Sequence, residues 1–317
     1  MRIALVHDFS GASVPGGEND AVRDQAAALT RAGHAVRLVT GGAGAPRELR
    51  AFAPDVVHVH QLSPAADRAR AAAWPGPLVV TLHRHRPPRR DPLLRRADRA
   101  VVLSEPSRDG WLAAGMPPER LALIPDHVPP VPDPGPAQRT AWVCVGRLAV
   151  ERGVLDLLRR WPARRRLDVV GTGPLERECR AAAPPSVRFL GVGGRDALRR
   201  SLTGYLGLVF PSRWHEGAVP LVYLEALAAG LPVLAFEGSA LPRAVRAEGT
   251  GTVTAPDAPL PAALAAADRV FPTLREHCRA VHAKRYGEAA WVERAERLYA
   301  AVRAEHRSAE HRSGERR

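Results

Sequence analysis

Residues 3–7 read Ile-Ala-Leu-Val-His, and residues 36–40 read Val-Arg-Leu-Val-Thr. Between these two apolar runs lie a glycine-containing loop, Gly11–Gly17, and a segment with helical spacing of apolar residues, Glu18–Ala32, which Gly33 closes. Short apolar runs of this kind are typical of parallel strands that are buried on both faces. A strand, a helix and a second strand in this order predict the first part of an α/β fold.

The same alternation fills both halves of the chain. Further strands are expected at Val56–His60, Leu78–Leu82, Ala100–Ser104, Trp142–Val145, Leu167–Val170, Val187–Leu190, Leu206–Phe210, Pro232–Ala235 and Gly251–Val253. Residues 124–140 contain six prolines and separate the halves, as an interdomain linker would. We therefore expect two domains, a hinge, a last amphipathic helix and a disordered polar tail. The two domains occupy residues 1–130 and 141–286, and the hinge between them occupies residues 131–140. The last helix covers residues 287–304, and the tail covers residues 305–317.

The charge of the chain raises the question of nucleic-acid binding. Its 317 residues include 46 Lys and Arg against 33 Asp and Glu, a net charge of +13. The arginines are dispersed, however, and aromatic residues make up only 5% of the chain, too few for a base-stacking platform. We expect no nucleic-acid partner. Two arginine clusters, at residues 84–90 and 164–166, remain candidates for anionic ligands.

Cysteine usage and hydropathy indicate a cytoplasmic protein. Cys144, Cys179 and Cys278 form no CxxC pair, so neither a disulfide framework nor a zinc site is expected. No apolar run reaches the ~18–20 residues of a membrane-spanning helix, which leaves peripheral membrane contact open. The chain starts directly with a strand pattern, so we expect no signal peptide. The arginine-, alanine- and proline-rich composition is typical of a high-GC bacterium.

Three glycine turns follow predicted strands. Gly16-Gly17 opens a helix after the first strand, and Gly171-Thr172-Gly173 follows a strand of the second half. Gly146-Arg147 ends another strand, with Arg152 five residues later. Backbone amides at helix N-termini and arginine side chains suit a diphosphate. Read from the residues alone, each turn is also explained by a plain tight turn or by surface arginines.

The segment Pro211–Gly230 carries the strongest single signal for a ligand. Glu225 lies in an otherwise apolar helical stretch, Leu221–Leu227, where a carboxylate is costly unless it is paired. We expect either a ligand hydroxyl or a buried partner for it. The alternative is that Glu225 merely lies at the edge of the apolar face. A second carboxylate, Glu216, precedes this helix.

Taken together, these motifs resemble the family 4 retaining glycosyltransferases of the GT-B type. The resemblance extends over nearly the whole chain and keeps the family's order of motifs. It includes Gly16-Gly17, Thr81-Leu82-His83, residues 97–104, Gly146-Arg147, residues 171–174, residues 187–191, Pro211-Ser212, and Glu216 with Glu225. It implies an α/β fold of two Rossmann-like domains facing across a cleft, with the last helix crossing back to the first domain.

The resemblance also implies roles for individual residues. Arg147, Arg152, His83 and Glu216 are expected to be catalytic: the arginines at the diphosphate, His83 in the active site and Glu216 at the donor sugar. Arg152 stands where the family usually has lysine. Glu225 is expected to bind the nucleotide ribose. The donor-binding set is completed by Gly16, Gly17, Gly146, Gly173, Leu190, Gly191 and Gly217.

The expected activity is transfer of a sugar from a nucleotide-sugar donor to an unknown acceptor hydroxyl, with retention of anomeric configuration. No DxD motif is present, so neither a metal nor another cofactor is expected. Two departures from the family concern the eight residues between Glu216 and Glu225, one more than usual, and the short segment after His83. Together with the basic surface, they keep open the alternative of a non-catalytic nucleotide-sugar-binding or scaffolding protein. A nucleotide-sugar epimerase of the same GT-B architecture is a further alternative.

Overall fold

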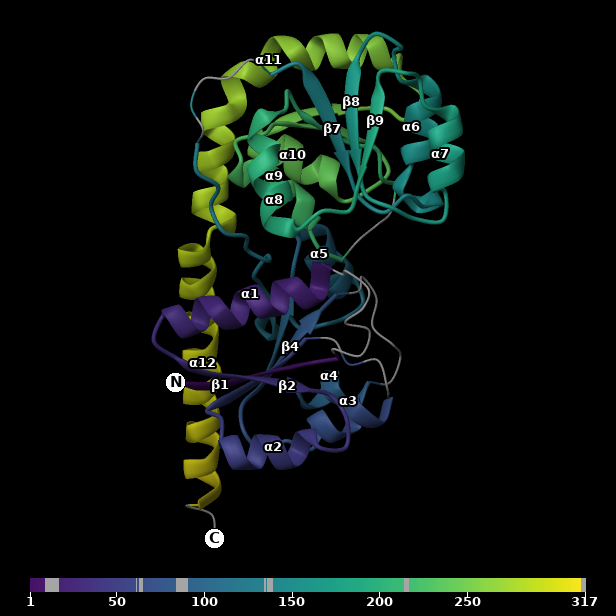
Figure 1. Cartoon of the computed structure of the whole chain (residues 1–317). Helices are drawn as coiled ribbons and strands as arrows, with labels where there is room; N and C mark the ends of the chain where they lie inside the picture. The colour runs from purple at the N-terminus through teal and green to yellow at the C-terminus, as the bar shows by residue number, and fades with distance from the viewer. Residues whose placement is uncertain are drawn as a thin grey trace. The chain divides into compact units, whose positions relative to one another are not determined.

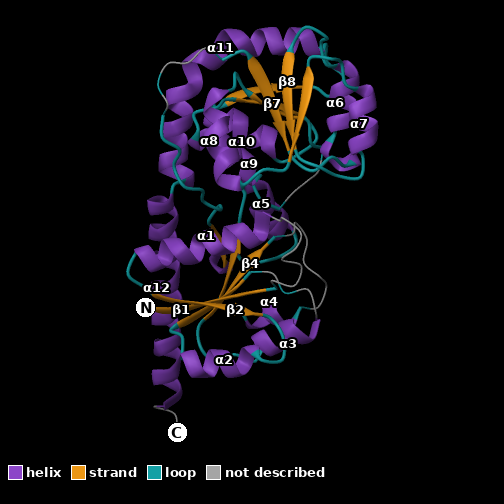
Figure 2. Ribbon diagram, viewed as in Figure 1, coloured by secondary structure: helices purple, strands orange, loops and turns teal. Residues whose placement is uncertain are grey.

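The computed structural model describes residues 1–8, 17–60, 62, 65–83, 91–133, 135, 139–213 and 217–314. The chain divides into two compact units (Figure 1). Unit 1 combines Met1–His127 with Glu288–Arg317, and unit 2 is Val128–Gly287. Each unit contains a six-stranded parallel sheet with helices packed against it, which confirms the predicted class of two α/β units (Figure 2).

The sheet of unit 1 has the strand order β2-β1-β3-β4-β5-β6. Its strands are β1 (Arg2–His7), β2 (Ala35–Thr40), β3 (Val56–Val59), β4 (Leu78–Leu82), β5 (Arg99–Val102) and β6 (Leu121–Leu123). Its helices are α1 (Gly17–Arg31), α2 (Ala45–Phe52), α3 (Ala65–Ala72), α4 (Pro92–Arg96), α5 (Glu105–Ala113), η1 (Pro118–Arg120) and α12 (Glu288–Gly314). β3 and β4 are buried along their whole length, because the parallel sheet is covered on both faces.

Helix α12 belongs to unit 1 although it is the last element of the chain. Its apolar face buries Trp291, Ala295 and Tyr299 completely or nearly so. Charged pairs with earlier elements accompany this packing, such as Arg31 with Glu288, whose Nη2 and Oε2 atoms lie 2.5 Å apart. The helix continues to Gly314 and so includes residues 305–314, which the sequence predicts as part of a disordered tail. Glu305, in this extension, pairs with Arg99.

The sheet of unit 2 has the strand order β12-β11-β10-β7-β8-β9. Its strands are β7 (Ala141–Val145), β8 (Arg166–Val170), β9 (Val187–Gly191), β10 (Leu208–Phe210), β11 (Val233–Phe236) and β12 (Gly251–Thr254). Its helices are η2 (Val150–Arg152), α6 (Val154–Arg160), α7 (Glu176–Ala182), α8 (Arg195–Ser201), η3 (Leu202–Gly204), α9 (Leu221–Ala228), α10 (Leu241–Glu248), α11 (Leu260–Val281) and the π-helical turn η4 (His282–Tyr286).

Helix α9 is buried in the core of unit 2 from Tyr223 to Ala228. The Tyr223 hydroxyl donates to Glu248 Oε2 at 2.6 Å, and the Tyr286 hydroxyl donates to the other oxygen of the same carboxylate. Two tyrosine hydroxyls therefore satisfy a buried charge and join α9, α10 and η4. This network fixes the helix that carries Glu225. No helix in the described part of the chain is both long and apolar enough to cross a membrane.

Candidate functional site

The loops at the carboxyl ends of β7 and β8 in unit 2 are locked together through glycines. Gly171 has a φ of +143°, and a Cβ atom there would lie 1.9 Å from the carbonyl oxygen of Gly146. A Cβ on Gly173 would lie 2.4 Å from the carbonyl oxygen of Leu148. The Gly146 amide donates to Val170 O at 2.9 Å, where the two loops begin. Glycine is therefore required at residues 171 and 173 by the close approach of two backbones.

The loop after β10 joins the same structure. Gly153 has a φ of +66°, and a Cβ there would lie 2.4 Å from Pro211 O. The Arg213 amide donates to Glu151 O at 3.2 Å. Three strand-end loops thus form one backbone framework at the edge of the sheet where α/β proteins bind ligands.

The two arginines expected at a diphosphate lie in this framework. Arg147 follows Gly146, which has a φ of +151° and open space where a Cβ would be. The Arg147 side chain is exposed and has no hydrogen bond or ion pair with the part of the chain that the structure describes. Arg152 is half-buried at the end of η2, directly before α6. An exposed guanidinium on a rigid loop is suited to binding an anion.

Glu225 is paired in the structure. Its side chain is 6% exposed, and its Oε1 atom accepts a hydrogen bond from Arg195 Nε at 2.8 Å. Arg195 is the first residue of α8, directly after the loop that leads from the carboxyl end of β9. This contact places the carboxylate at the same edge of the sheet as the glycine framework. Of the two alternatives expected for Glu225, a ligand hydroxyl or a buried partner, the structure shows a protein partner, which is partly buried.

The structure also describes three of the other residues that are expected to bind the donor. Leu190 is 51% exposed at the end of β9, and Gly191 follows with a φ of +69° and accepts a hydrogen bond from the Gly171 amide at 2.8 Å. The structure therefore brings Leu190 and Gly191 next to the β8 loop. Gly217 is buried shortly before α9. Glu216 and Gly16, which are also expected at the site, lie outside the residues that the structure describes.

Unit 1 carries a row of histidines at the corresponding edge of its sheet. His7 ends β1, His60 follows β3 and His83 follows β4, and these three strands are neighbours. The ring centroid of His60 lies 6.5 Å from that of His7 and 6.2 Å from that of His83. His58 stacks on His60 with their centroids 4.4 Å apart. Sequence analysis identified His83 alone.

Burial keeps these imidazoles neutral. It lowers the pKa of His83 to about 4, with a smaller contribution from His7. Burial also lowers the pKa of His60 well below its ordinary value, and His58 adds to the effect. Neither ring nitrogen of His60 has a hydrogen-bond partner among the described residues. At neutral pH His83 is therefore uncharged, with one nitrogen that can donate and one that can accept a hydrogen bond.

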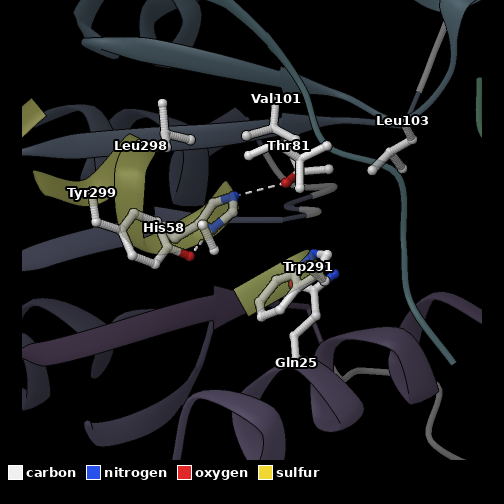
Figure 3. A pocket seen from close by; sticks show the side chains of 10 residues that line it. Gln25, His58, Thr81, Val101, Leu103, Trp291, Leu298 and Tyr299 are labelled. Carbon is white, nitrogen blue, oxygen red and sulfur yellow. Dashed lines mark hydrogen bonds between the residues drawn. The ribbon is translucent and has the colours of Figure 1, made fainter. Parts of the chain in front are cut away.

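His58 connects this row to α12 through a small pocket inside unit 1 (Figure 3). Its Nδ1 atom lies 2.7 Å from the hydroxyl of Tyr299, and its Nε2 atom lies 2.7 Å from the hydroxyl of Thr81. Gln25 and Trp291 face the same pocket, and Gln25 Nε2 donates to Asp126 Oδ1 at 3.0 Å. The last helix of the chain thus contributes to the support of the histidine row.

The N-terminal end of α1 lies close to His83. Gly17 is the exposed first residue of α1, and the Oε1 atom of the next residue, Glu18, lies 3.9 Å from His83 Nδ1. The side chain that follows Gly17 in the sequence thus lies near His83, and a role of Gly17 and His83 at one site stays a prediction. Within the described ranges, no group of three or more His, Cys, Asp or Glu side chains is placed to hold a metal ion.

Two family models match the chain. The model described as Glycosyltransferase Family 4 matches residues 41–130, and the model described as Glycosyl transferases group 1 matches residues 139–269. The two matches lie on the two halves in sequence order. A search of curated proteins found no match.

Solved structures with the same fold cover both units. AviGT4, a glycosyltransferase involved in avilamycin A biosynthesis, is 21% identical over 96% of this chain and 98% of its own, with a TM-score of 0.72. Anabaena HepE in complex with UDP is 17% identical over 95% of this chain and 100% of its own, with a TM-score of 0.71. Sucrose-phosphate synthase from Thermosynechococcus elongatus is 20% identical over 96% and 99%, with a TM-score of 0.72.

Proposed function

Because this chain belongs to the family 4 glycosyltransferases with the GT-B fold, we propose that it transfers a sugar from a nucleotide-sugar donor to an acceptor hydroxyl with retention of anomeric configuration. The observation that carries the proposal is the edge of the unit 2 sheet. There an exposed arginine on a glycine framework and a paired, buried carboxylate occur together. HepE, which shares this fold, has been solved with UDP and with UDP-glucose.

Arg147 and Arg152 are assigned to the diphosphate of the donor. As the bond between sugar and phosphate breaks, negative charge grows on the leaving diphosphate. Two guanidinium groups held by the framework would stabilise that charge without a metal ion. Arg147 supports this role best, because it is exposed and has no competing partner among the described residues.

Glu225 is assigned to the nucleotide ribose. A carboxylate has acceptor capacity for several hydrogen bonds, so pairing with Arg195 is compatible with two further bonds from ribose hydroxyls. Glu216 is assigned to the donor sugar by the resemblance alone. The nucleotide would therefore be held at two points, by the arginines at its diphosphate and by Glu225 at its ribose.

The acceptor would enter from unit 1, near His83 and the donor-binding residue Gly17. A neutral His83 can accept or donate a hydrogen bond to a hydroxyl, which suits a role in orienting the acceptor. In the retaining reaction that the resemblance implies, the leaving phosphate itself takes the proton of the attacking hydroxyl on the same face of the sugar. No protein nucleophile is required.

The proposal is tested with a panel of nucleotide sugars, beginning with UDP-glucose. Nucleotide release that depends on an added acceptor, with a product of unchanged anomeric configuration, is the expected result. Binding without turnover would indicate a binding protein, and isomerisation of the donor without an acceptor would indicate an epimerase. Inversion at the anomeric carbon would overturn the stereochemical part of the proposal.

A paired substitution separates the two carboxylates. Glu225→Gln should weaken binding of free nucleotide by at least about tenfold, because charge-assisted hydrogen bonds are worth ~1.5–3 kcal/mol each. Glu216→Gln should leave nucleotide binding unchanged and lower the rate of sugar transfer. Unchanged nucleotide affinity in Glu225→Gln would remove the ribose assignment.

A further inference from the structure

The partner of Glu225 comes from a part of unit 2 that no motif singled out. Arg195 follows Gly193-Gly194 and opens α8, thirty residues before the carboxylate that it contacts. Its side chain is 21% exposed, against 6% for that of Glu225. The arginine side chain is thus partly exposed, whereas the carboxylate that it contacts is nearly enclosed.

The contact fixes the orientation of the carboxylate. Arg195 Nε donates to Glu225 Oε1 at 2.8 Å, the length of a charge-assisted hydrogen bond. The Glu225 backbone is held in a helix that is buried from Tyr223 to Ala228, so the remaining freedom of the residue lies in its side-chain torsions. A planar guanidinium bonded to one carboxylate oxygen restricts those torsions.

We propose that Arg195 is a positioning residue that holds the Glu225 carboxylate ready for both ribose hydroxyls and so sets a preference for ribose over 2′-deoxyribose nucleotides. This inference rests on the proposed function, since it needs a nucleotide at Glu225. Recognition of the 2′-hydroxyl then depends on a residue that does not itself need to touch the ligand.

The segment that leads to Arg195 also carries exposed apolar side chains. The same short segment carries Leu190 and Val192, which are 51% and 58% exposed. Large exposed apolar side chains next to a predicted nucleotide site offer a surface for a planar base. Residues 190–195 would therefore serve both the base and, through Glu225, the ribose.

A purely structural ion pair is the competing explanation. Buried ion pairs contribute little net stability when compared with apolar replacements, so a change in melting temperature does not separate the two explanations. The ratio of affinities for ribose and 2′-deoxyribose nucleotides does separate them. A structural role would change both affinities together, whereas a positioning role changes mainly the affinity for the ribose form.

The experiment measures this ratio by isothermal titration calorimetry on the full chain. UDP, ADP and GDP are each compared with their 2′-deoxy forms, using wild type, Arg195→Met, Arg195→Lys and Arg199→Met. Arg199 lies one turn further along α8, where it pairs with Asp196, and serves as the matched control. With the nucleotide that binds wild type, Arg195→Met should bind the ribose form at least about tenfold more weakly. The 2′-deoxy form, which keeps only its 3′-hydroxyl for Glu225, should lose clearly less affinity.

The other variants should differ from Arg195→Met in the ratio of the two affinities. Arg195→Lys keeps the charge without the planar fork and should recover part of the ratio, and Arg199→Met should match wild type. In a Glu225→Gln background, Arg195→Met should have little further effect on the ratio, because the group that it positions has already been altered. If Arg195→Met does not fold, the comparison of Arg195→Lys with Arg199→Met decides the question.

Results that would contradict the role of Arg195 differ from results that would contradict the proposed function. An unchanged ratio, or an equal loss for both forms, would overturn the role of Arg195 while leaving a nucleotide-binding glycosyltransferase in place. Tighter binding of the ribose form by Arg195→Met would also overturn it, since Arg195 would then compete with the ribose. Failure of wild type to bind all three diphosphates and to turn over any nucleotide sugar of the panel would overturn the proposed function, and this inference with it.

Discussion

His58 of β3 and Tyr299 of α12 are joined by a hydrogen bond of 2.7 Å between Nδ1 and the hydroxyl, across 241 residues of sequence. Both side chains are buried, and the second ring nitrogen of His58 bonds Thr81. A neutral imidazole has one donor and one acceptor, so these two contacts satisfy it completely. The bond ties the last helix to the strand that supports the histidine row.

Removal of the Tyr299 hydroxyl should therefore destabilise unit 1. Tyr299→Phe leaves Nδ1 of His58 without its buried partner, which costs about 1–3 kcal/mol in the free energy of unfolding. Urea unfolding followed by circular dichroism measures this change. In a His58→Leu background the same substitution should cost less, and an equal cost in both backgrounds would show that the hydrogen bond is not the cause.

The buried histidines predict a loss of stability in acid. Burial lowers the pKa of His58 to about 3 and that of His83 to about 4 in the folded chain, below the ordinary value of 6.5. Between pH 6.5 and about 4 the unfolded chain therefore binds more protons than the folded chain, and stability falls as pH falls. Each group contributes up to about 1.4 kcal/mol per pH unit.

Urea midpoints measured between pH 7.5 and 4.5 would show this dependence, at values chosen to bracket the titration of unfolded histidine near ~6.5. His58→Gln removes one of the groups and should reduce the slope of the unfolding free energy against pH, whatever its effect on absolute stability. A slope identical to that of wild type would mean that His58 is not the source of the acid sensitivity.

Loss of charge at Arg147 should damage turnover and spare the fold. Arg147→Ala removes an exposed side chain without described partners, so its melting temperature should match that of wild type. The rate of sugar transfer should fall by ~10²–10³, as when one contact to developing charge is lost. Arg152→Ala should act in the same direction, and Arg152→Lys should be milder.

The matched control is Arg159→Ala, on α6, where the arginine is 62% exposed and pairs with Asp156. It removes one positive charge from the same unit and should leave the rate unchanged. Full activity in both Arg147→Ala and Arg152→Ala would show that the diphosphate is bound elsewhere.

Sugar transfer should survive chelation of divalent metals. The proposed reaction places the charge of the leaving diphosphate on arginines, so initial rates with and without EDTA should agree. The measurement uses a donor that the panel has identified. Activity lost with EDTA and restored by magnesium or manganese would contradict the metal-independent mechanism.

The glycine framework makes a prediction about stability. Gly171→Ala introduces a Cβ 1.9 Å from Gly146 O at a φ of +143°, so overpacking and backbone strain act together. We expect a loss of at least about 2 kcal/mol in the unfolding free energy. Gly194→Ala is the control, because its φ is −63° and nothing lies within 4 Å of the added carbon. Equal stability of the two variants would refute the close-approach argument.

Parallel strands were the most predictable part of the fold. β4 was expected at Leu78–Leu82 and has those bounds, because a strand buried on both faces reads as a continuous apolar run. The long helix α11, Leu260–Val281, was not predicted. It contains Pro272, and a proline inside a helical pattern normally indicates its end.

Read from the residues alone, the candidate site was predictable only where a residue type is unfavourable in its local surroundings. Glu225 was identified because a carboxylate in an apolar helix needs a partner, but the partner itself was not. Arg195 is one of many arginines in the sequence, and its contact depends on how α8 packs beside α9. His60 was missed because a histidine after a buried strand looks like the polar end of that strand until its ring neighbours are known.

The division of unit 1 between the two ends of the chain has a consequence for synthesis. Unit 2 is one continuous stretch, Val128–Gly287, and all of its residues are made before helix α12 of unit 1. Unit 1 cannot do so before unit 2 has been made, because Trp291 and Tyr299 line its inner pocket and follow unit 2 in the chain. One side of the support of its histidine row is therefore missing until the chain beyond unit 2 has been made.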